Sequence, residues 1–210
     1  MESERSFDSV TYYDRLAADL APRYDAVTFD VVHPNLSEHL PTEGRVLDIG
    51  SGSGRDARGL AARGLQVTAV EPSLAFRHIG EANRFSGITW IDDRLPKLAH
   101  FDSVPPFDFI LCSAVLMLFD LEDLRESFRT MARLLAPYGR LAVDIRDPMP
   151  GEPMGIHAHP EAQILKVAAG ARLACIDYAE RNDALGRPEY LWRSYVFSQQ
   201  TLPCDRVREA

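Results

Sequence analysis

The sequence has 210 residues, of which 46% are hydrophobic and 26% are charged, and its formal net charge at pH 7 is −8. A chain of this size can bury roughly 70% of its unfolded surface. Its length and the absence of a long apolar segment predict one domain over residues 1–210 without a membrane partner. We expect a monomer or a homodimer, and the sequence does not choose between them. The negative charge argues against nucleic acid as a partner, because binding to its phosphates depends on Lys and Arg contacts.

The N-terminal segment, residues 1–41, predicts two short helices rather than a signal peptide. Its first eight residues include acidic side chains and no hydrophobic core, and the three cysteines of the chain lack metal-type spacing. We therefore expect a cytoplasmic protein without a metal site. Apolar residues recur at helical spacing over residues 6–20 and 24–40, and Pro22 and Pro34 interrupt the pattern.

Residues 45–56 form an apolar run that ends in three alternate glycines and continues into a helical pattern, which predicts a strand, a tight turn and a helix. Glycine permits a positive φ and close approach of a ligand, and the free amides that open a helix favour an anionic group by about 0.3 to 1 kcal/mol. A second apolar run, residues 66–70, ends at Glu71. A carboxylate at this distance beyond the glycines can accept hydrogen bonds from the two hydroxyls of an adenosine ribose. The pattern predicts a nucleoside-binding site.

The glycine spacing bears on which nucleoside is bound. A dinucleotide fingerprint has its last glycine one place later than Gly54, and Arg55 occupies that place. An NAD(P)-dependent oxidoreductase is therefore an alternative that the spacing disfavours. A non-catalytic protein that binds a nucleoside is a second alternative.

The rest of the chain alternates between strand and helix patterns. The expected elements, in order, are a helix over 72–84, a strand over 87–91 that ends in Asp92 and Asp93, a strand over 108–112 followed by Ser113, a helix over 120–135, a turn at 137–139, a strand over 140–145, a helix over 161–169, and two strands over 173–178 and 190–197. The segment 146–160 is rich in Pro, Gly, Met and His and leaves the end of a strand, so we expect it to be a substrate loop.

Residues 46–54, followed by Val70-Glu71-Pro72-Ser73, resemble the first two motifs of class I S-adenosylmethionine-dependent methyltransferases. Residues 134–145 resemble a later segment of the same family, with Tyr138 a mild departure. The resemblance implies an α/β, Rossmann-like, doubly wound sheet of seven strands, mostly parallel with an antiparallel last strand, and with helices on both faces. It implies N-terminal cap helices in 1–41, a cofactor-binding core in 45–146, and a substrate loop, helix and last strands in 147–200.

The resemblance also implies roles for the motif residues. The glycines would admit the methionine part of S-adenosylmethionine, Asp48 would help to fix its amino group, Glu71 would hold the ribose, and either Asp92 or Asp93 would face the adenine. Ser113 differs from the carboxylate of metal-dependent O-methyltransferases and from the Asn or Asp of amino-methylating DNA enzymes. The full set of expected cofactor residues is Asp48, Gly50, Ser51, Gly52, Gly54, Arg55, Glu71, Pro72, Asp92, Asp93, Ser113 and Tyr24.

The expected reaction is methyl transfer to a small-molecule acceptor. The sulfonium of the cofactor is already activated, so the main task is alignment, which can contribute on the order of 7 to 11 kcal/mol. Such a reaction requires no dedicated catalytic residue, and the catalytic group stays unassigned, with His33, His157 and Tyr24 as candidates. Aromatic residues of the N-terminal segment, Tyr12, Tyr13 and Tyr24, are expected to help close the pocket.

Overall fold

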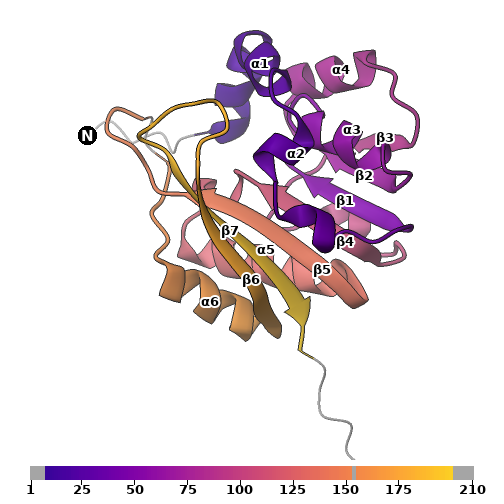
Figure 1. Ribbon diagram of the computed structural model, residues 1–210, viewed down its shortest axis with the longest axis vertical. Helices are drawn as coiled ribbons and strands as arrows, with labels where there is room; N and C mark the ends of the chain where they lie inside the picture. Colours follow the sequence, from indigo (N-terminus) through magenta and orange to yellow (C-terminus); the bar gives the residue numbers. More distant parts are fainter. Residues whose placement is uncertain (1–7, 153–154, 201–210) are drawn as a thin grey trace, which may run out of the picture.

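A computed structural model describes residues 8–152 and 155–200 of the chain. Seven strands form one sheet in the order β3-β2-β1-β4-β5-β7-β6 (Figure 1). The strands are β1 (Arg45–Ile49), β2 (Gln66–Val70), β3 (Ile88–Ile91), β4 (Phe107–Ser113), β5 (Leu135–Arg146), β6 (Leu173–Asn182) and β7 (Leu191–Gln199). β7 is antiparallel to both of its neighbours, and the other pairings are parallel. The predicted fold class is confirmed.

Helices cover both faces of the sheet, as predicted (Figure 1). They are α1 (Ser9–Asp25), α2 (Phe29–Val32), α3 (Arg55–Ala61), α4 (Leu74–Ala82), α5 (Leu121–Leu134) and α6 (Glu161–Gly170). Successive strand residues point to opposite faces. Leu47 packs with α5 and α6, whereas its neighbour Val46 packs with α3. None of the helices in the described ranges is both long and apolar enough to span a bilayer.

The N-terminal segment differs from its prediction. α1 continues through Pro22 to Asp25, and the expected helix over 24–40 is wrong, because only α2 and a short 3-10 turn, Leu36–Glu38, form there. Ala17 and Ala21 of α1 pack on Phe76 of α4. This burial compensates for the backbone hydrogen bond that a proline removes from a helix.

A polar contact fixes α1 over the carboxyl ends of the strands. The carboxylate of Asp14 accepts hydrogen bonds from the Ser73 hydroxyl at 2.7 Å and from the Ala75 amide at 2.8 Å. Ser73 is also the N-cap of α4, where its side chain accepts from the Phe76 amide. The start of α4 and the middle of α1 are thereby tied together beside the end of β2.

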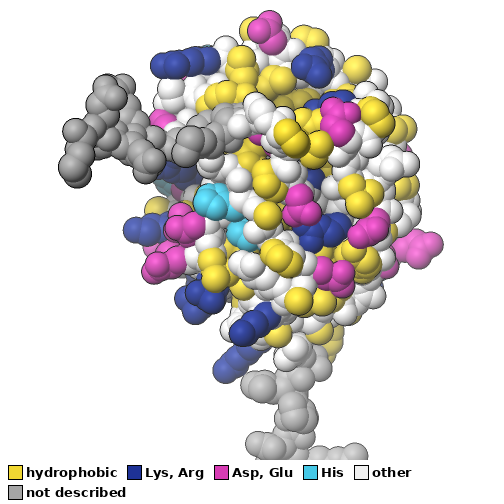
Figure 2. Space-filling model, turned by 90° about the vertical axis from the view of Figure 1, so that its left-hand side faces the viewer, with side chains coloured by type: hydrophobic (Ala, Val, Ile, Leu, Met, Phe, Trp, Pro, Cys, Tyr) yellow, Lys and Arg dark blue, Asp and Glu magenta, His cyan; other side chains and the backbone are white. Residues whose placement is uncertain are grey.

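The C-terminal strands are longer than predicted. The carboxyl ends of β5 and β6 and the amino end of β7 lie at the same edge of the sheet as the carboxyl ends of β1, β2 and β4. β5 begins at Leu135 instead of residue 140, because Phe107 pairs with Leu135 and a register shift follows. Arg146 at the end of β5 pairs with Trp192, which in turn pairs with Arg181 near the end of β6. On the face that Figure 2 shows, acidic and basic side chains are interspersed with apolar ones.

Candidate functional site

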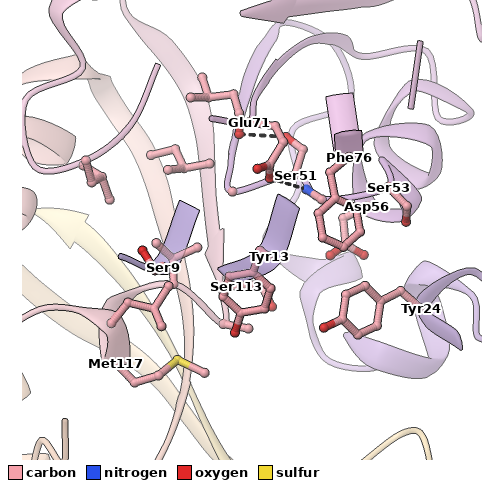
Figure 3. A pocket seen from close by; sticks show the side chains of 18 of the residues that line it. Ser9, Tyr13, Tyr24, Ser51, Ser53, Asp56, Glu71, Phe76, Ser113 and Met117 are labelled. Atoms are coloured by element: carbon pink, nitrogen blue, oxygen red, sulfur yellow. Dashed lines mark hydrogen bonds between the residues drawn. The ribbon is translucent and has the colours of Figure 1, made fainter. Parts of the chain in front are cut away.

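A cavity of about 780 Å³ lies at the carboxyl ends of the strands (Figure 3). Its wall includes residues of α1, the turn after β1, the ends of β2 to β5, and the connection between β6 and β7. Sites for small molecules typically have volumes of about 300 to 1,000 Å³. The cavity is therefore large enough for small ligands, at the sheet edge where open α/β sheets bind them.

The glycine turn forms part of this wall. The amides of Gly50 and Ser51 donate to the carbonyl of Val70 at 2.8 and 3.0 Å, which holds the turn against the end of β2. Gly52 has a φ of +54°, and a Cβ at this position would meet nothing within 4 Å. Gly54, with a φ of +84°, lies outside the wall, and a Cβ there would come within 2.8 Å of the Trp90 ring. Gly54 is thus required for packing, whereas Gly52 leaves open space toward the cavity.

Glu71 lies directly beside the glycine turn. One carboxylate oxygen accepts from the Gly52 amide at 2.8 Å, and the other accepts from the Ser73 amide at 2.8 Å. The side chain lines the cavity and lies next to Ser51 in Figure 3. Burial raises the pKa of Glu71 against the effect of these hydrogen bonds. The acid and the glycine turn, which the sequence assigns to one nucleoside site, are thus in direct contact.

The structure distinguishes the two acids after β3. Asp93 lines the cavity, and its carboxylate accepts from the amides of Arg94 and His100, each at 2.8 Å. Burial alone would raise the pKa of Asp93, but these hydrogen bonds outweigh it and lower the pKa below its ordinary value. Asp92 lies outside the wall, has a side chain that is 65% exposed, and pairs with Arg77 at 2.9 Å. Of the two candidates, only Asp93 can therefore contact a ligand in the cavity.

Most of the other predicted residues line the cavity. Tyr24 stacks on Phe76 with 6.1 Å between ring centroids, and the Ser113 hydroxyl donates to Asp144 at 3.1 Å. Tyr13 and Tyr24, both from α1, are among the labelled side chains of the cavity in Figure 3. The wall includes the predicted residues Gly50, Ser51, Gly52, Arg55, Glu71, Pro72, Asp93, Ser113 and Tyr24, and also Tyr13, but not Tyr12.

Asp48 lies behind the wall. It is 2% exposed, and one of its carboxylate oxygens is buried without a hydrogen-bond partner in the described part of the chain. Burial and the neighbouring charge of Asp56 raise the pKa of the Asp48 carboxyl to about 7. A nearby positive charge favours the ionised form of such a buried carboxyl. Asp48 is therefore suited to a cationic ligand group, which would also satisfy its unpaired oxygen.

A chain of charged side chains borders the cavity and was not foreseen from the sequence; its three central members are buried, and its two ends are half-buried. It runs Arg55, Asp56, His33, Asp144 and Arg181, and we call it the ion-pair chain. His33 Nδ1 lies 2.9 Å from Asp144, and Nε2 lies 3.2 Å from Asp56. Arg55 pairs with Asp56 at 2.7 Å, and Arg181 pairs with Asp144 at 2.8 Å. The one sequence signal is Asp144, an aspartate within the otherwise apolar run 141–145 of β5.

His33 holds this chain together rather than facing a ligand. Its side chain is fully buried and lies outside the cavity wall. Burial alone would lower the pKa of His33, but the charges of Asp56 and Asp144 raise it to about 9. His157, the other histidine candidate, also lies outside the wall, and its amide donates to the Met117 carbonyl at 2.7 Å. Of the three candidates for a catalytic group, Tyr24 is the one that the structure places on the wall.

We expect stability to depend on pH through His33. Its pKa is about 9 in the folded protein, compared with the ordinary histidine value of 6.5 in an unfolded chain. Because the folded value is the higher one, the stabilisation is complete below pH 6.5 and is lost as pH rises through 9, by roughly 3 kcal/mol in total. Urea unfolding from pH 6 to 10 should show this decline in the wild type and not in His33→Leu. Equal slopes for the two proteins would exclude His33 as its source.

Comparisons with known proteins bear on this site. A family described as "Methyltransferase domain" matches residues 12–174. An uncharacterized methyltransferase of Staphylococcus carnosus is 30% identical over 137 residues, which cover 59% of this chain and 62% of the relative. The chain spans about three fifths of the length of the curated relatives it matches.

Solved structures that are similar in fold include two methyltransferases. The Burkholderia thailandensis 1,6-didemethyltoxoflavin-N1-methyltransferase, with bound 1,6-didemethyltoxoflavin and S-adenosylhomocysteine, is 17% identical, with a TM-score of 0.70 and coverage of 94% of this chain and 93% of that one. The CcbJ methyltransferase from Streptomyces caelestis is 17% identical, with a TM-score of 0.73 and coverage of 93% and 100%. At these identities the likeness concerns the fold.

Proposed function

The chain belongs to the methyltransferase domain family and has the class I, S-adenosylmethionine-dependent methyltransferase fold. From this membership we propose that it transfers a methyl group from S-adenosylmethionine to a small-molecule acceptor. The family predicted from the motifs is confirmed, and its cofactor is S-adenosylmethionine. The observation that supports the proposed activity most is the contact between Glu71 and the Gly52 amide on the cavity wall. The NAD(P)-dependent alternative is set aside by the family match.

The residues at the β1–β3 end of the cavity fit the cofactor. When bound, S-adenosylmethionine supplies a methyl group on a positively charged sulfur. Gly52 would receive its methionine part, and Glu71 would accept hydrogen bonds from the ribose hydroxyls. The unpaired oxygen of Asp48 would attract the amino group, directly or through water. Asp93, which follows β3 on the cavity wall, would contact the adenine.

The rest of the cavity would position the acceptor and exclude water. Val115, Met117, Leu118 and Phe119 give this part of the wall an apolar character. Burial raises the pKa of Tyr24, so its hydroxyl is protonated at neutral pH and acts as a hydrogen-bond donor rather than a base. Orientation behind the methyl group then supplies the rate enhancement. A small-molecule acceptor is consistent with this volume, and the structurally similar Burkholderia enzyme binds a small molecule.

Glu71→Gln should weaken the binding of S-adenosylhomocysteine by more than about tenfold, because a hydrogen bond to a charged group contributes about 1.5 to 3 kcal/mol. Glutamine keeps one oxygen as an acceptor for one of the two amides, Gly52 or Ser73, but loses the charge and the second acceptor. Isothermal titration calorimetry measures the affinity. Asp92→Asn, which changes an exposed acid after the next strand, is the matched control and should bind normally.

The outcomes separate the alternatives. If the wild type binds neither S-adenosylmethionine nor S-adenosylhomocysteine, the proposed function is wrong. Unchanged affinity in Glu71→Gln would move the ribose contact to another residue. Tight binding without formation of S-adenosylhomocysteine, in a screen of small amines, phenols and thiols, would favour a non-catalytic protein that binds the nucleoside.

A further inference from the structure

Three arginines line the end of the cavity that lies away from Glu71. Arg146 ends β5, Arg181 lies near the end of β6, and Arg187 belongs to the connection between β6 and β7. The sheet order places β4 and β1 between these strands and β2, which precedes Glu71. If the nucleoside occupies the β1–β3 end, the arginines face the remaining space, where an acceptor would lie.

Aromatic rings hold the three guanidinium groups in place. Arg146 and Arg187 lie 4.4 and 4.2 Å from the centroid of the Tyr190 ring. Arg181 lies 5.7 Å from the centroid of the Trp192 ring. A guanidinium that stacks on a ring keeps its N–H donors at the edge, where they can bind the oxygens of an anion.

The three arginines differ in how fully their donors are used. Both terminal nitrogens of Arg146 donate to Glu152, so this pair has a structural role. Arg187 uses Nε and one terminal nitrogen for Asp183. Within the described ranges, Nη1 of Arg181 and Nη1 of Arg187 make no hydrogen bond. These two residues retain donors for a ligand.

The ion-pair chain gives Arg181 a charge that its partner does not cancel. Asp144 is shared between Arg181 and His33, and Asp56 is shared between His33 and Arg55. With His33 protonated, the chain has three positive members and two negative ones. Its two ends, Arg55 and Arg181, are both on the cavity wall. The five side chains therefore carry one positive charge in excess. Asp48, which interacts with Asp56 and Arg55, offsets part of it at the Arg55 end. The uncompensated charge is left at the Arg181 end, where burial strengthens its attraction for an anion.

We infer that the methyl acceptor carries an anionic oxygen group, a carboxylate, which is bound by Arg181 and Arg187, and this inference rests on the function proposed above. The apolar side chains of Met117, Leu118 and Phe119 on the same cavity wall indicate that the rest of the acceptor is partly apolar. Planar guanidinium donors match the geometry of a carboxylate. The site would then select an acid over its neutral amide.

The test uses the full chain saturated with S-adenosylhomocysteine, with benzoate, benzamide and phenyl phosphate as probes. Calorimetry should show benzoate bound about tenfold more tightly than benzamide, a difference of about 1.4 kcal/mol. Phenyl phosphate distinguishes a carboxylate site from a phosphate site. If benzoate does not bind at millimolar concentration, binds no better than benzamide, or binds more weakly than phenyl phosphate, the assignment of a carboxylate is wrong.

Arg181→Gln and Arg187→Gln should each reduce the preference for benzoate over benzamide to roughly threefold or less, because each removes one charged donor. Asp144 keeps its contact with His33 in the first variant, so the fold is expected to survive. The matched control is Arg129→Gln on the exposed surface of α5, which changes the net charge equally.

S-adenosylhomocysteine binding separates the two proposals. Normal binding of S-adenosylhomocysteine combined with an unaltered preference in both variants would overturn the inference and leave the proposed function standing. If the wild type fails to bind S-adenosylhomocysteine, the proposed function itself is overturned.

Discussion

Replacement of His33 by leucine is expected to destabilise the protein by about 3 to 5 kcal/mol, because it removes the cation between two buried carboxylates. Asp56 and Asp144 are 7% and 3% exposed, and each lies within 3.2 Å of an imidazole nitrogen of His33. Leucine leaves both charges in place and removes their common partner. A loss of this size is a large fraction of the roughly 5 to 15 kcal/mol that stabilises a typical domain.

Urea unfolding followed by circular dichroism at pH 7 measures this loss. His78→Leu is the matched control, because His78 is exposed on α4 and the change is otherwise identical. The control should stay within about 0.5 kcal/mol of the wild type, as is usual for surface substitutions. A His33→Leu protein that is as stable as His78→Leu would show that the ion-pair chain contributes no net stability.

The parts of the fold that were predicted correctly depend on local sequence. The run from Val46 to Glu71 contains its own strand, turn, helix and second strand, and each boundary is marked by glycine, by a change of period or by an acid. The contact between Glu71 and Gly52 follows because neighbouring parallel strands end at the same sheet edge. Here the chain order alone determines the geometry.

The parts that were missed depend on residues that are distant in the sequence. Asp56, Asp144 and Arg181 come from three separate elements and His33 from the end of α2, and no spacing pattern connects them. The failed helix over 24–40 has the same origin, because contacts of α1 and α2 with α4 and α3 override the local periodicity.

The sequence also does not distinguish Asp92 from Asp93 as the acid that faces the cavity. The two residues are adjacent, and both follow the end of β3 at Ile91. Asp93 binds backbone amides beside the cavity, whereas Asp92 reaches Arg77 at the surface. Local sequence predicts an acid at this edge but not the direction in which each side chain leaves the backbone.

Gly52→Ala is expected to weaken the binding of S-adenosylhomocysteine on the order of a hundredfold, or about 2.7 kcal/mol. A Cβ at Gly52 would meet no protein atom within 4 Å, so it would occupy space on the cavity side of the turn. The methionine part of the cofactor is proposed to lie against this backbone, and a methyl group there would force it away. Isothermal titration calorimetry measures the change in affinity.

Gly64→Ala is the control that separates this steric effect from backbone strain. Gly64 also has a positive φ, +85° against +54° for Gly52, and a Cβ there would likewise meet nothing within 4 Å. It follows α3 at the exposed surface, away from the cavity wall. Both variants should lose about 1 to 2 kcal/mol of unfolding free energy, the usual cost of a left-handed conformation for a residue other than glycine. Only Gly52→Ala should lose affinity, and an equal affinity in the two variants would show that the cofactor does not lie against Gly52.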